Sequence, residues 1–409
     1  MRVTLALAWR NLWRQPRRTW LTASAVAFAA ALLVFLITLQ LGAYDLLVET
    51  STRVFTGALA VQRPGYHERP QLHATIPAAS RLAETLRERT GLAAVAVRAY
   101  GFALVSSDAR SYGVRVAGVE PEREPAVSTL PRLVVRGRYL SGRRAPEILV
   151  GERLARTLRA EVGRELTLLG SGKDGAVAAT VLPVVGVFAS GHPELDRGLV
   201  LVPLGTFQEL FGLADEGHAV VIAPPDLARL DAVTRAVAAA LPADPPLAVL
   251  DWETLVPGLK ELIQADLVQT WFLYLSLVVL VTFSVLNTML MAVLERTREF
   301  GVMLALGATP ARIAGLVMLE SLLLALVGLA IGLAAGGGVA LYFRVHGFTF
   351  PGLREIHAQF GLPGIVRPKL SAGALALGPT VILVFTQLAA LVPAARIRRL
   401  AAAAALAAA

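Results

Sequence analysis

Residues suited to covalent or metal-assisted chemistry are few in this 409-residue chain. It has no cysteine, which excludes disulfides, thiolate metal sites and cysteine nucleophiles. The histidines form no HExxH or other metal-binding spacing, and no G-x-S-x-G nucleophile elbow is present. We therefore predict neither a catalytic nor a metal site, and we expect the histidines on the surface or in loops. They are His67, His73, His192, His218, His346 and His357.

One short motif, Gly170-Ser171-Gly172-Lys173, looks like the end of a phosphate-binding loop. The full motif needs a glycine five positions before Gly172, where Thr167 stands, and a hydroxyl residue after the lysine, where Asp174 stands. A carboxylate at that position would repel phosphate, and no helix pattern follows. We interpret residues 170–175 as a hairpin turn between two strands.

The segment 295–312 carries a group of charged residues followed by an apolar flank. Its charged members are Glu295, Arg296, Arg298 and Glu299, and its apolar flank is Met303, Leu304 and Leu306. Gly307 can end a helix in a left-handed cap, and Thr309 with Pro310 can begin the next one. We predict a short helix here, which is either a solvated connector or a docking element whose apolar residues need a partner surface.

The composition is that of a membrane protein. Hydrophobic residues make up 55% of the chain and charged residues 17%, with a mean hydropathy of +0.61, which excludes a disordered protein and argues against an ordinary soluble enzyme. Four apolar stretches reach the roughly 20 residues that span a bilayer. We place them at 19–44, 267–294, 313–343 and 371–395, separated by segments 45–266, 295–312 and 344–370.

The distribution of charge orients these spans. The chain has a net charge of +9, yet segment 45–266 holds 24 basic and 26 acidic residues. The excess of arginine instead flanks the apolar stretches, as the positive-inside rule requires, so we predict no nucleic-acid partner. We expect the N-terminal segment 1–18, the 295–312 loop and the tail 396–409 in the cytoplasm, and segment 45–266 outside.

The N-terminal segment has its own amphipathic pattern. Leu5, Trp9, Leu12 and Trp13 share one helical face, and arginines occupy another. We predict a helix that lies at the membrane surface and ends at Pro16, the alternative being a simple continuation of the first span.

Segment 45–266 alternates strand and helix patterns, which predicts an α+β domain, with two subdomains as one arrangement. The strand-like runs are 57–62, 93–106, 112–119, 147–150, 165–169, 177–189, 198–202 and 219–223, and the helix-like runs are 77–89, 152–160, 226–241 and 252–264.

The spans contain few polar or packing signals. Gly328, Gly332 and Gly336 form a stripe that lets another helix approach, either another span or a second copy of the chain. Glu320 is the one acidic residue within a span, and we expect it to be paired, protonated or facing a protein-lined cavity. Asn287 and Gln387 are expected to bond either to another helix or to their local backbone.

Three segments together resemble the FtsX/MacB/LolC family of ABC-transporter permeases. They are the run 287–309 with Glu320-Ser-Leu-Leu-Leu, the N-terminal run 8–19, and Pro393-Ala-Ala-Arg396 followed by Arg398-Arg399-Leu400. The resemblance also covers the spacing of the four spans and the large domain after the first. Within the family, the size of this domain and runs such as 64–70 look most like the LolC/LolE lipoprotein-releasing branch.

The resemblance implies a fold and a mode of action. It implies four transmembrane helices in the bacterial inner membrane, with a Porter-like and Sabre-like periplasmic α+β domain between the first and second. This chain would itself be no enzyme and carry no cofactor. ATP and magnesium would be bound by a separate ABC ATPase subunit, and a second permease copy or paralogue, membrane lipids and a periplasmic acceptor protein would be its other partners.

The resemblance also implies roles for the 295–312 loop. It would be the coupling helix that docks on the ATPase, through Glu295, Arg296, Arg298, Glu299, Phe300, Gly301, Leu304, Leu306 and Gly307. ATP hydrolysis would then drive motion of the periplasmic domain, to extract or export lipoprotein or another hydrophobic cargo. The alternatives are an FtsX-like mechanical regulator of a periplasmic partner and a MacB-like efflux component.

Overall fold

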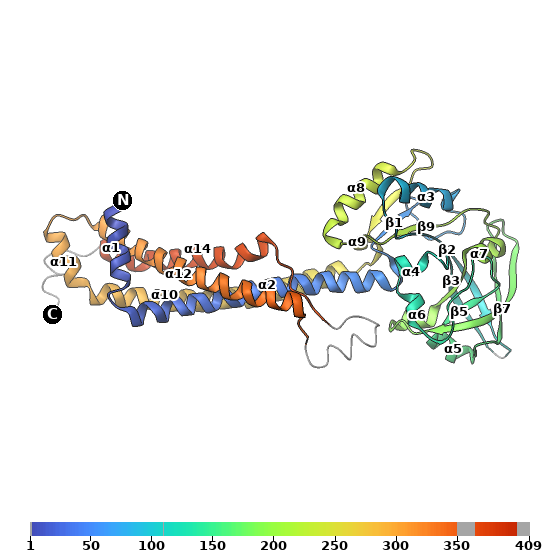
Figure 1. Cartoon of the computed structure of the whole chain (residues 1–409), viewed down its shortest axis with the longest axis horizontal. Helices are drawn as coiled ribbons and strands as arrows, with labels where there is room; N and C mark the ends of the chain where they lie inside the picture. Colours follow the sequence, from blue (N-terminus) through green and yellow to red (C-terminus); the bar gives the residue numbers. More distant parts are fainter. Residues whose placement is uncertain (1, 109, 350–364, 399–409) are drawn as a thin grey trace. The chain divides into compact units, whose positions relative to one another are not determined.

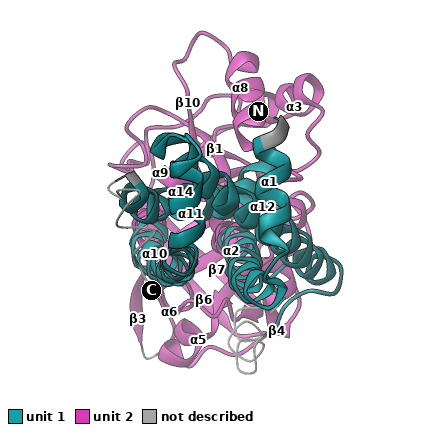
Figure 2. Cartoon of the chain, turned by 90° about the vertical axis from the view of Figure 1, so that its left-hand side faces the viewer, with its two compact units in different colours: residues 1–44, 263–349, 365–409 teal, residues 45–262, 350–364 magenta. Residues whose placement is uncertain are grey.

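The computed structural model describes all residues except 1, 109, 350–364 and 399–409. It divides into two compact units (Figure 2): the helical unit, residues 1–44, 263–349 and 365–409, and the sheet unit, residues 45–262 and 350–364. Most of the predicted 344–370 loop and of the 396–409 tail, with His357, lies outside the described residues.

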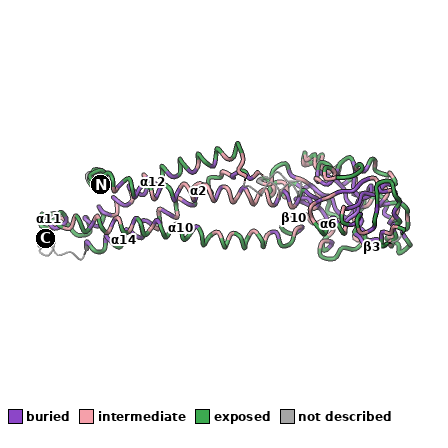
Figure 3. The backbone as a smooth tube through the Cα atoms, turned by 90° about the horizontal axis from the view of Figure 1, so that it is seen from below, coloured by how far each residue is buried: buried purple, intermediate pink, exposed green. Residues whose placement is uncertain are grey.

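Six helices belong wholly or mainly to the helical unit (Figure 1). They are α1 (Arg2–Leu12), α2 (Pro16–Ser51), α10 (Leu259–Glu295), α11 (Thr297–Ala305), α12 (Pro310–His346) and α14 (Ala372–Arg398). Four of them, α2, α10, α12 and α14, are long and apolar enough to cross a membrane, which confirms the four predicted spans. Large parts of α10 and α14 are exposed along their length (Figure 3).

The helices extend further than the predicted spans. α2 starts at Pro16 and runs to Ser51, followed by the π-helical turn η1 (Thr52–Thr56), and α10 starts at Leu259. At 1.5 Å per residue the 37-residue α10 is roughly 55 Å long, well beyond a hydrocarbon core of about 30 Å. Hydropathy detects only the part of a helix that lies in lipid, so it misses polar turns that continue the same helix.

α1 is a separate helix, so the alternative of a continuous first span is wrong. It ends at Leu12, and Pro16 opens α2 rather than closing α1, as proline suits the first turn of a helix. Trp13 lies between Trp9 and Trp20, with edge-on ring contacts of 5.9 Å to each. This aromatic row occupies the junction of the two helices, and Trp is typical of membrane interfaces.

The sheet unit contains one ten-stranded sheet. Its strands are β1 (Leu59–Gln62), β2 (Val95–Ser106), β3 (Ser111–Val119), β4 (Val134–Gly137), β5 (Ile148–Gly151), β6 (Glu165–Ser171), β7 (Val177–Phe188), β8 (Leu199–Pro203), β9 (Ala219–Ile222) and β10 (Ala248–Asp251). The order is β10-β1-β9-β2-β3-β8-β5-β7-β4, and β6 joins β7 back to β2. The strands β2, β3, β8, β5, β7 and β6 therefore form a closed ring, and the long β2 also carries the open part of the sheet.

Short helices complete the sheet unit. They are α3 (Ala79–Thr90), α4 (Glu124–Val127), η2 (Leu130–Leu133), α5 (Glu152–Leu158), α6 (Pro193–Gly198), α7 (Leu204–Phe211), η3 (Leu227–Arg229), α8 (Leu230–Ala240) and α9 (Trp252–Leu255). Phe207 and Phe211 of α7 are fully buried in the main core. Gly118 of β3 makes room for them, because a Cβ there would lie 2.5 Å from the Cβ of Phe207.

The sequence patterns missed some short elements and misjudged one boundary. α4, α6, α7, β4 and β10 were not expected, since four- to eight-residue elements leave little periodicity to detect. The expected helix 252–264 is interrupted, because Gly258 adopts a φ of +89° between α9 and α10.

A hairpin turn does join β6 to β7, but Gly170 and Ser171 are still part of β6, so the turn begins at Gly172 rather than at Gly170. Gly175 adopts a φ of +81°, and the carboxylate of Asp174 accepts a hydrogen bond from the Ala176 amide at 3.0 Å. The Lys173 ammonium pairs with Glu216. The lysine of this motif thus has a structural role within the sheet unit.

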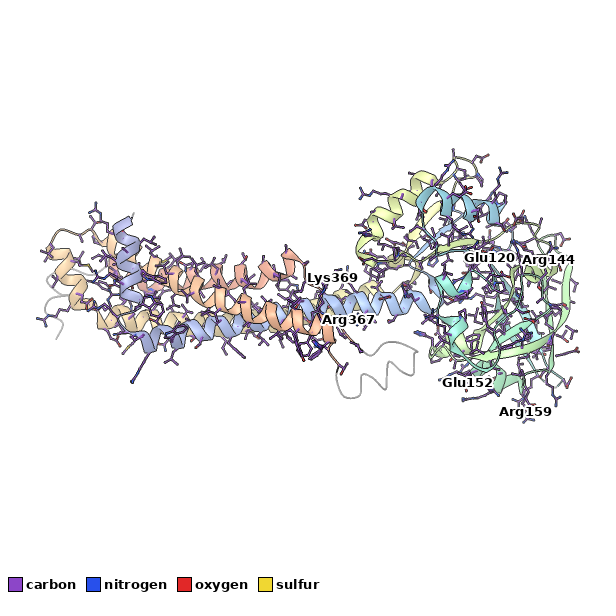
Figure 4. The ribbon with its side chains drawn as sticks, in the orientation of Figure 1. Glu120, Arg144, Glu152, Arg159, Arg367 and Lys369 are labelled. Carbon is purple, nitrogen blue, oxygen red and sulfur yellow. The ribbon has the colours of Figure 1, made fainter. Side chains whose placement is uncertain are left out.

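A short extended segment returns the chain to α14 in the helical unit. Arg367 and Lys369, labelled in Figure 4, belong to it, and the Lys369 amide donates a hydrogen bond of 2.8 Å to the Thr38 carbonyl of α2. Gly42 permits this approach, because a Cβ at Gly42 would lie 2.0 Å from the Arg367 carbonyl oxygen.

Candidate functional site

The candidate site is α11 and the ends of the helices around it. α11 follows α10 after a break at Arg296, which has non-helical backbone angles. Phe300 of α11 is fully buried in a small core with Val293, Ile313 and Val317. Burying a phenylalanine stabilises by about 1.5–3 kcal/mol, so Phe300 anchors this short helix to α10 and α12.

The opposite face of α11 is exposed. Arg298, Val302, Ala305 and Leu306 follow one another at helical spacing on this face, and Leu306 is 83% exposed. This set, which we call the α11 face, combines one cation with apolar residues. An exposed apolar patch beside charge is typical of a docking surface.

The residues predicted to couple α11 to a partner differ in their exposure. Glu295, Arg298, Glu299, Leu306 and Gly307 are exposed, whereas Phe300 and Gly301 are buried, and Arg296 and Leu304 are half-buried. Gly307 adopts a φ of +92° just after the helix, as a C-terminal glycine is expected to do. Sequence reasoning did not single out Val302 or Ala305, which the exposed face now adds.

Glu320 is paired. Its carboxylate accepts hydrogen bonds from Arg296 Nη1, at 3.0 and 3.2 Å, and from the Asn11 side-chain amide of α1 at 2.7 Å. The side chains of Arg296 and Glu320 are only 18% and 10% exposed. The partner cation and the amide offset the cost of placing a carboxylate within an apolar helix. Glu320 is thus paired, as one expectation had it, and it also lines a protein-bounded cavity.

Further ion pairs extend this cluster. Arg296 Nε also binds Glu299 at 3.1 Å, Arg14 binds Glu299 at 3.2 Å, and Arg18 binds Glu295 at 2.9 Å. We call Asn11, Arg14, Arg18, Glu295, Arg296, Glu299 and Glu320 the α11 charge network. It connects α11 to α1, α2, α10 and α12, and a cavity of about 210 Å³ lies among its residues.

The glycine stripe of α12 packs on α2. A Cβ on Gly328, Gly332 or Gly336 would lie 2.8, 2.5 and 2.5 Å from the backbone oxygens of Ala23, Ala27 and Ala31. Three small residues at spacing four thus meet three others at the same spacing. Of the two expected partners for this stripe, the structure has the other span.

Asn287 and Gln387 form neither of the bonds expected for them. The Asn287 side chain is exposed, and no hydrogen bond to it is present among the described residues. The side-chain nitrogen of Gln387 is buried and has no partner in the described part of the chain. The sequence alone does not show which polar residues of the spans form hydrogen bonds between helices. Asn287 and Gln387 do not form one among the described residues, whereas Gln40 does.

Gln40 belongs to a second polar cluster, between α2 and α10. Its amide nitrogen lies 2.9 Å from Thr270 Oγ1, and its amide oxygen accepts a 2.9 Å hydrogen bond from the Tyr274 hydroxyl. The Tyr44 hydroxyl donates to Asp266 at 2.6 Å. α2 is therefore joined to α10 by polar contacts near both ends of the bundle, here and at Arg18.

Within the sheet unit a buried ion pair holds the end of η1. Arg98 of β2 and Glu124 of α4 are both fully buried, with Nε–Oε2 and Nη2–Oε1 distances of 3.1 and 2.5 Å. Arg98 also donates to the Phe55 carbonyl and lies 4.3 Å from the centre of the Phe55 ring. Sequence reasoning missed this pair, because nothing in the pattern around Arg98 distinguishes it from surface arginines.

His218 lies in the bend before β9, which fits the expectation of histidines on the surface or in loops, but it is not on the surface. It is fully buried, accepts a hydrogen bond at Nδ1 from the Tyr100 amide at 3.0 Å, and donates from Nε2 to the Leu72 carbonyl at 3.1 Å. Tyr66 stacks on its ring. No group of three metal-binding side chains occurs in the described part of the chain.

Comparison with known proteins agrees with this arrangement. Residues 19–240 match the family model of the MacB-like periplasmic core domain, and residues 271–402 match the FtsX-like permease C-terminal model. The chain belongs to the FtsX/MacB/LolC family of ABC-transporter permeases. It is a membrane protein whose periplasmic core domain lies between its first and second spans.

Individual relatives are distant. The chain is 25% identical over 285 residues to the lipoprotein-releasing system transmembrane protein LolC of Xylella fastidiosa, covering 67% of this chain and 68% of the relative. It is 24% identical over 258 residues to LolC of Neisseria meningitidis, covering 61% of each. Among solved structures, the extracellular domain of the transporter YknZ matches 47% of this chain and 99% of that domain, with 14% identity and a TM-score of 0.37.

Proposed function

We propose that this chain is the permease subunit of a transporter in which a separate cytoplasmic ATPase drives work in the periplasm through mechanical transmission. One observation carries the proposal: α11 is anchored by Phe300, is exposed on one face, and is tied to its surroundings by ion pairs. Glu299 pairs with Arg14 and with Arg296, the residue before α11, and Arg296 pairs with Glu320 of α12. A helix built in this way passes on a displacement of its face to the bundle.

The ATPase partner binds the α11 face in this proposal. Val302 and Leu306 supply apolar contacts and Arg298 supplies a cation, while ATP and magnesium are bound by the partner. The arginines around α1 and α11 support a cytoplasmic location for this end of the bundle, with the spans in a bacterial inner membrane. A second permease covers the apolar surfaces that α10 and α14 leave exposed.

Movement reaches the periplasmic side along α2. α12 packs on α2 through the glycine stripe, α2 is joined to α10 at Arg18 and Tyr44, and η1 at the end of α2 is held by Arg98. Lipoprotein or another hydrophobic molecule is the proposed cargo, on the strength of the LolC relatives.

The test is co-expression with a candidate ATPase and measurement of ATP hydrolysis and cargo release. We expect Arg298→Ala combined with Leu306→Ala to lower ATPase association at least about tenfold, because two exposed contacts of about 1 kcal/mol each are removed. Arg10→Ala is the matched control, since Arg10 is an exposed arginine of α1 outside the α11 face.

Normal association and normal stimulated hydrolysis in the double variant would contradict the docking assignment. Mass spectrometry of proteins and lipids that copurify in mild detergent identifies the cargo. A bound lipoprotein supports lipoprotein release, whereas a periplasmic protein without lipid indicates a mechanical regulator.

A further inference from the structure

The sheet unit contains two adjoining cavities beside η1. The inner cavity, of about 350 Å³, is lined by residues of η1, β1, β2 and β3 and by the segment 66–72. The outer cavity, of about 800 Å³, is more open. Phe55, Thr56, Phe102 and Arg115 line both, so the two form one continuous site, within the size range of ligand pockets.

The inner cavity has a polar group that lacks a partner. Gln62 lines it from the end of β1, and its side chain is only 6% exposed. Its Oε1 atom is buried and has no hydrogen-bond partner among the described residues. Buried amide groups in proteins nearly always have hydrogen-bond partners. A bound group that can form a hydrogen bond with an amide would supply the partner that Gln62 Oε1 lacks.

The cation Arg115 lines both cavities. Arg115 of β3 is exposed and forms no ion pair with any described residue. No acidic side chain is among the described residues that line the inner cavity, whereas Glu194 lines the outer one. The inner cavity therefore favours an anionic ligand, with Arg115 as its counter-ion.

The walls of the site are largely aromatic. Phe102 pairs with Arg115 across strands β2 and β3 and is 68% exposed, although it is a large apolar side chain. Tyr66, Tyr100 and Phe55 line the inner cavity. Such walls favour an apolar side chain between the amide-binding and anion-binding positions.

We propose that this site binds the C-terminal end of an apolar peptide. The terminal carboxylate pairs with Arg115, a peptide group hydrogen-bonds with the Gln62 amide, and an apolar side chain packs among the aromatic rings. A peptide group offers both a donor and an acceptor, so it satisfies Gln62 whichever way its amide is turned. A simple fatty acid offers the anion and the apolar body but no donor for the amide oxygen.

The test uses the full chain in lipid nanodiscs, without an ATPase, and isothermal titration calorimetry with acetyl-Ala-Ala-Phe. We expect the peptide with a free carboxylate to bind at least about tenfold more tightly than its C-terminal amide, as a hydrogen-bonded charge pair warrants. Arg115→Gln should abolish that difference, and Gln62→Leu should weaken both forms. Arg136→Gln, an exposed arginine of β4 outside the site, is the matched control.

Three outcomes would overturn the proposal: equal affinity for acid and amide, no heat of binding for either at millimolar concentration, or unchanged affinity in Arg115→Gln. Octanoate binding as tightly as the peptide would also overturn it, in favour of an acyl ligand. Thermal unfolding shows whether Gln62→Leu is folded. If Gln62→Leu is unstable, the affinity of Arg115→Gln for the acid and the amide tests the proposal by itself. Because no ATPase is present, failure here is separate from failure of the coupling proposal.

Discussion

Single residues in this protein acquire their roles from partners distant in sequence. Glu320 would be costly in a membrane helix, yet Arg296 and Asn11 bind it and leave no unpaired charge. Inside the sheet unit, the buried charges of Arg98 and Glu124 are likewise paired with each other. Each pair was visible in the sequence only as two separate ionisable residues.

His218 gives a prediction at this scale, in the pH dependence of stability. Burial lowers the pKa of His218 to about 4, from an ordinary value of 6.5. Because the unfolded chain takes up the proton first, the stabilisation is present above pH 6.5 and is lost as the pH falls towards 4. We expect unfolding free energy to drop by about 2 kcal/mol between pH 7 and pH 4.5 from this residue alone.

Denaturant unfolding of the full chain at both pH values measures this loss. In His218→Gln the drop should be smaller by that amount, since the other titrating groups remain. An identical pH dependence in the two proteins would show that His218 does not remain neutral in the folded state.

At the scale of elements, α2 and α12 meet through two stripes of small residues. The stripes Ala23, Ala27, Ala31 and Gly328, Gly332, Gly336 bring the backbones close enough that a methyl group cannot be added without movement. Close backbone approach replaces the hydrophobic effect as the source of association between helices in lipid.

The contact predicts opposite signs for two similar substitutions. Gly332→Ala should destabilise the helical unit by about 1–3 kcal/mol, because its Cβ would meet the Ala27 carbonyl and the Ala30 methyl. Gly337→Ala has nothing within 4 Å and should be neutral or stabilise by about 0.5–1 kcal/mol, as alanine favours helix. Thermal unfolding in detergent compares the two, and equal effects would argue against this packing.

At the scale of the whole molecule, the proposed coupling depends on contacts at both ends of α2. The α11 charge network holds its first turns through Arg18, and Arg98 holds Phe55 in the η1 turn after its last. Both attachments are polar, and the one at Arg98 is fully buried. A second substitution can therefore restore the stability that is lost with such a contact without restoring the function.

A double variant tests this distinction. Arg98→Met should destabilise by about 3–5 kcal/mol because it leaves Glu124 buried without its partner, and Arg98→Met with Glu124→Leu should recover most of that loss. We expect the double variant to keep ATPase stimulation but to lose cargo release, because Phe55 is no longer held. Full cargo release in a stable double variant would mean that the Arg98 contact does not transmit motion.

The amino-acid sequence by itself determined the four spans, the α+β class of the inserted domain and most of its strands. These features follow from local periodicity and from runs of apolar residues. Both can be detected by comparing residues that are close together in the sequence. The same local signals predicted a short helix within 295–312 and a hairpin between the strands that became β6 and β7.

Only the tertiary structure decided which side chains meet. It paired Asn11 with Glu320 across 309 positions and turned Phe300 inward and Leu306 outward. Beside one cavity it left Gln62 Oε1 without a hydrogen-bond partner and Arg115 without an ion-pair partner among the described residues. Such contacts depend on how elements pack in three dimensions, and no spacing along the chain encodes the distance between two surfaces that meet only after folding.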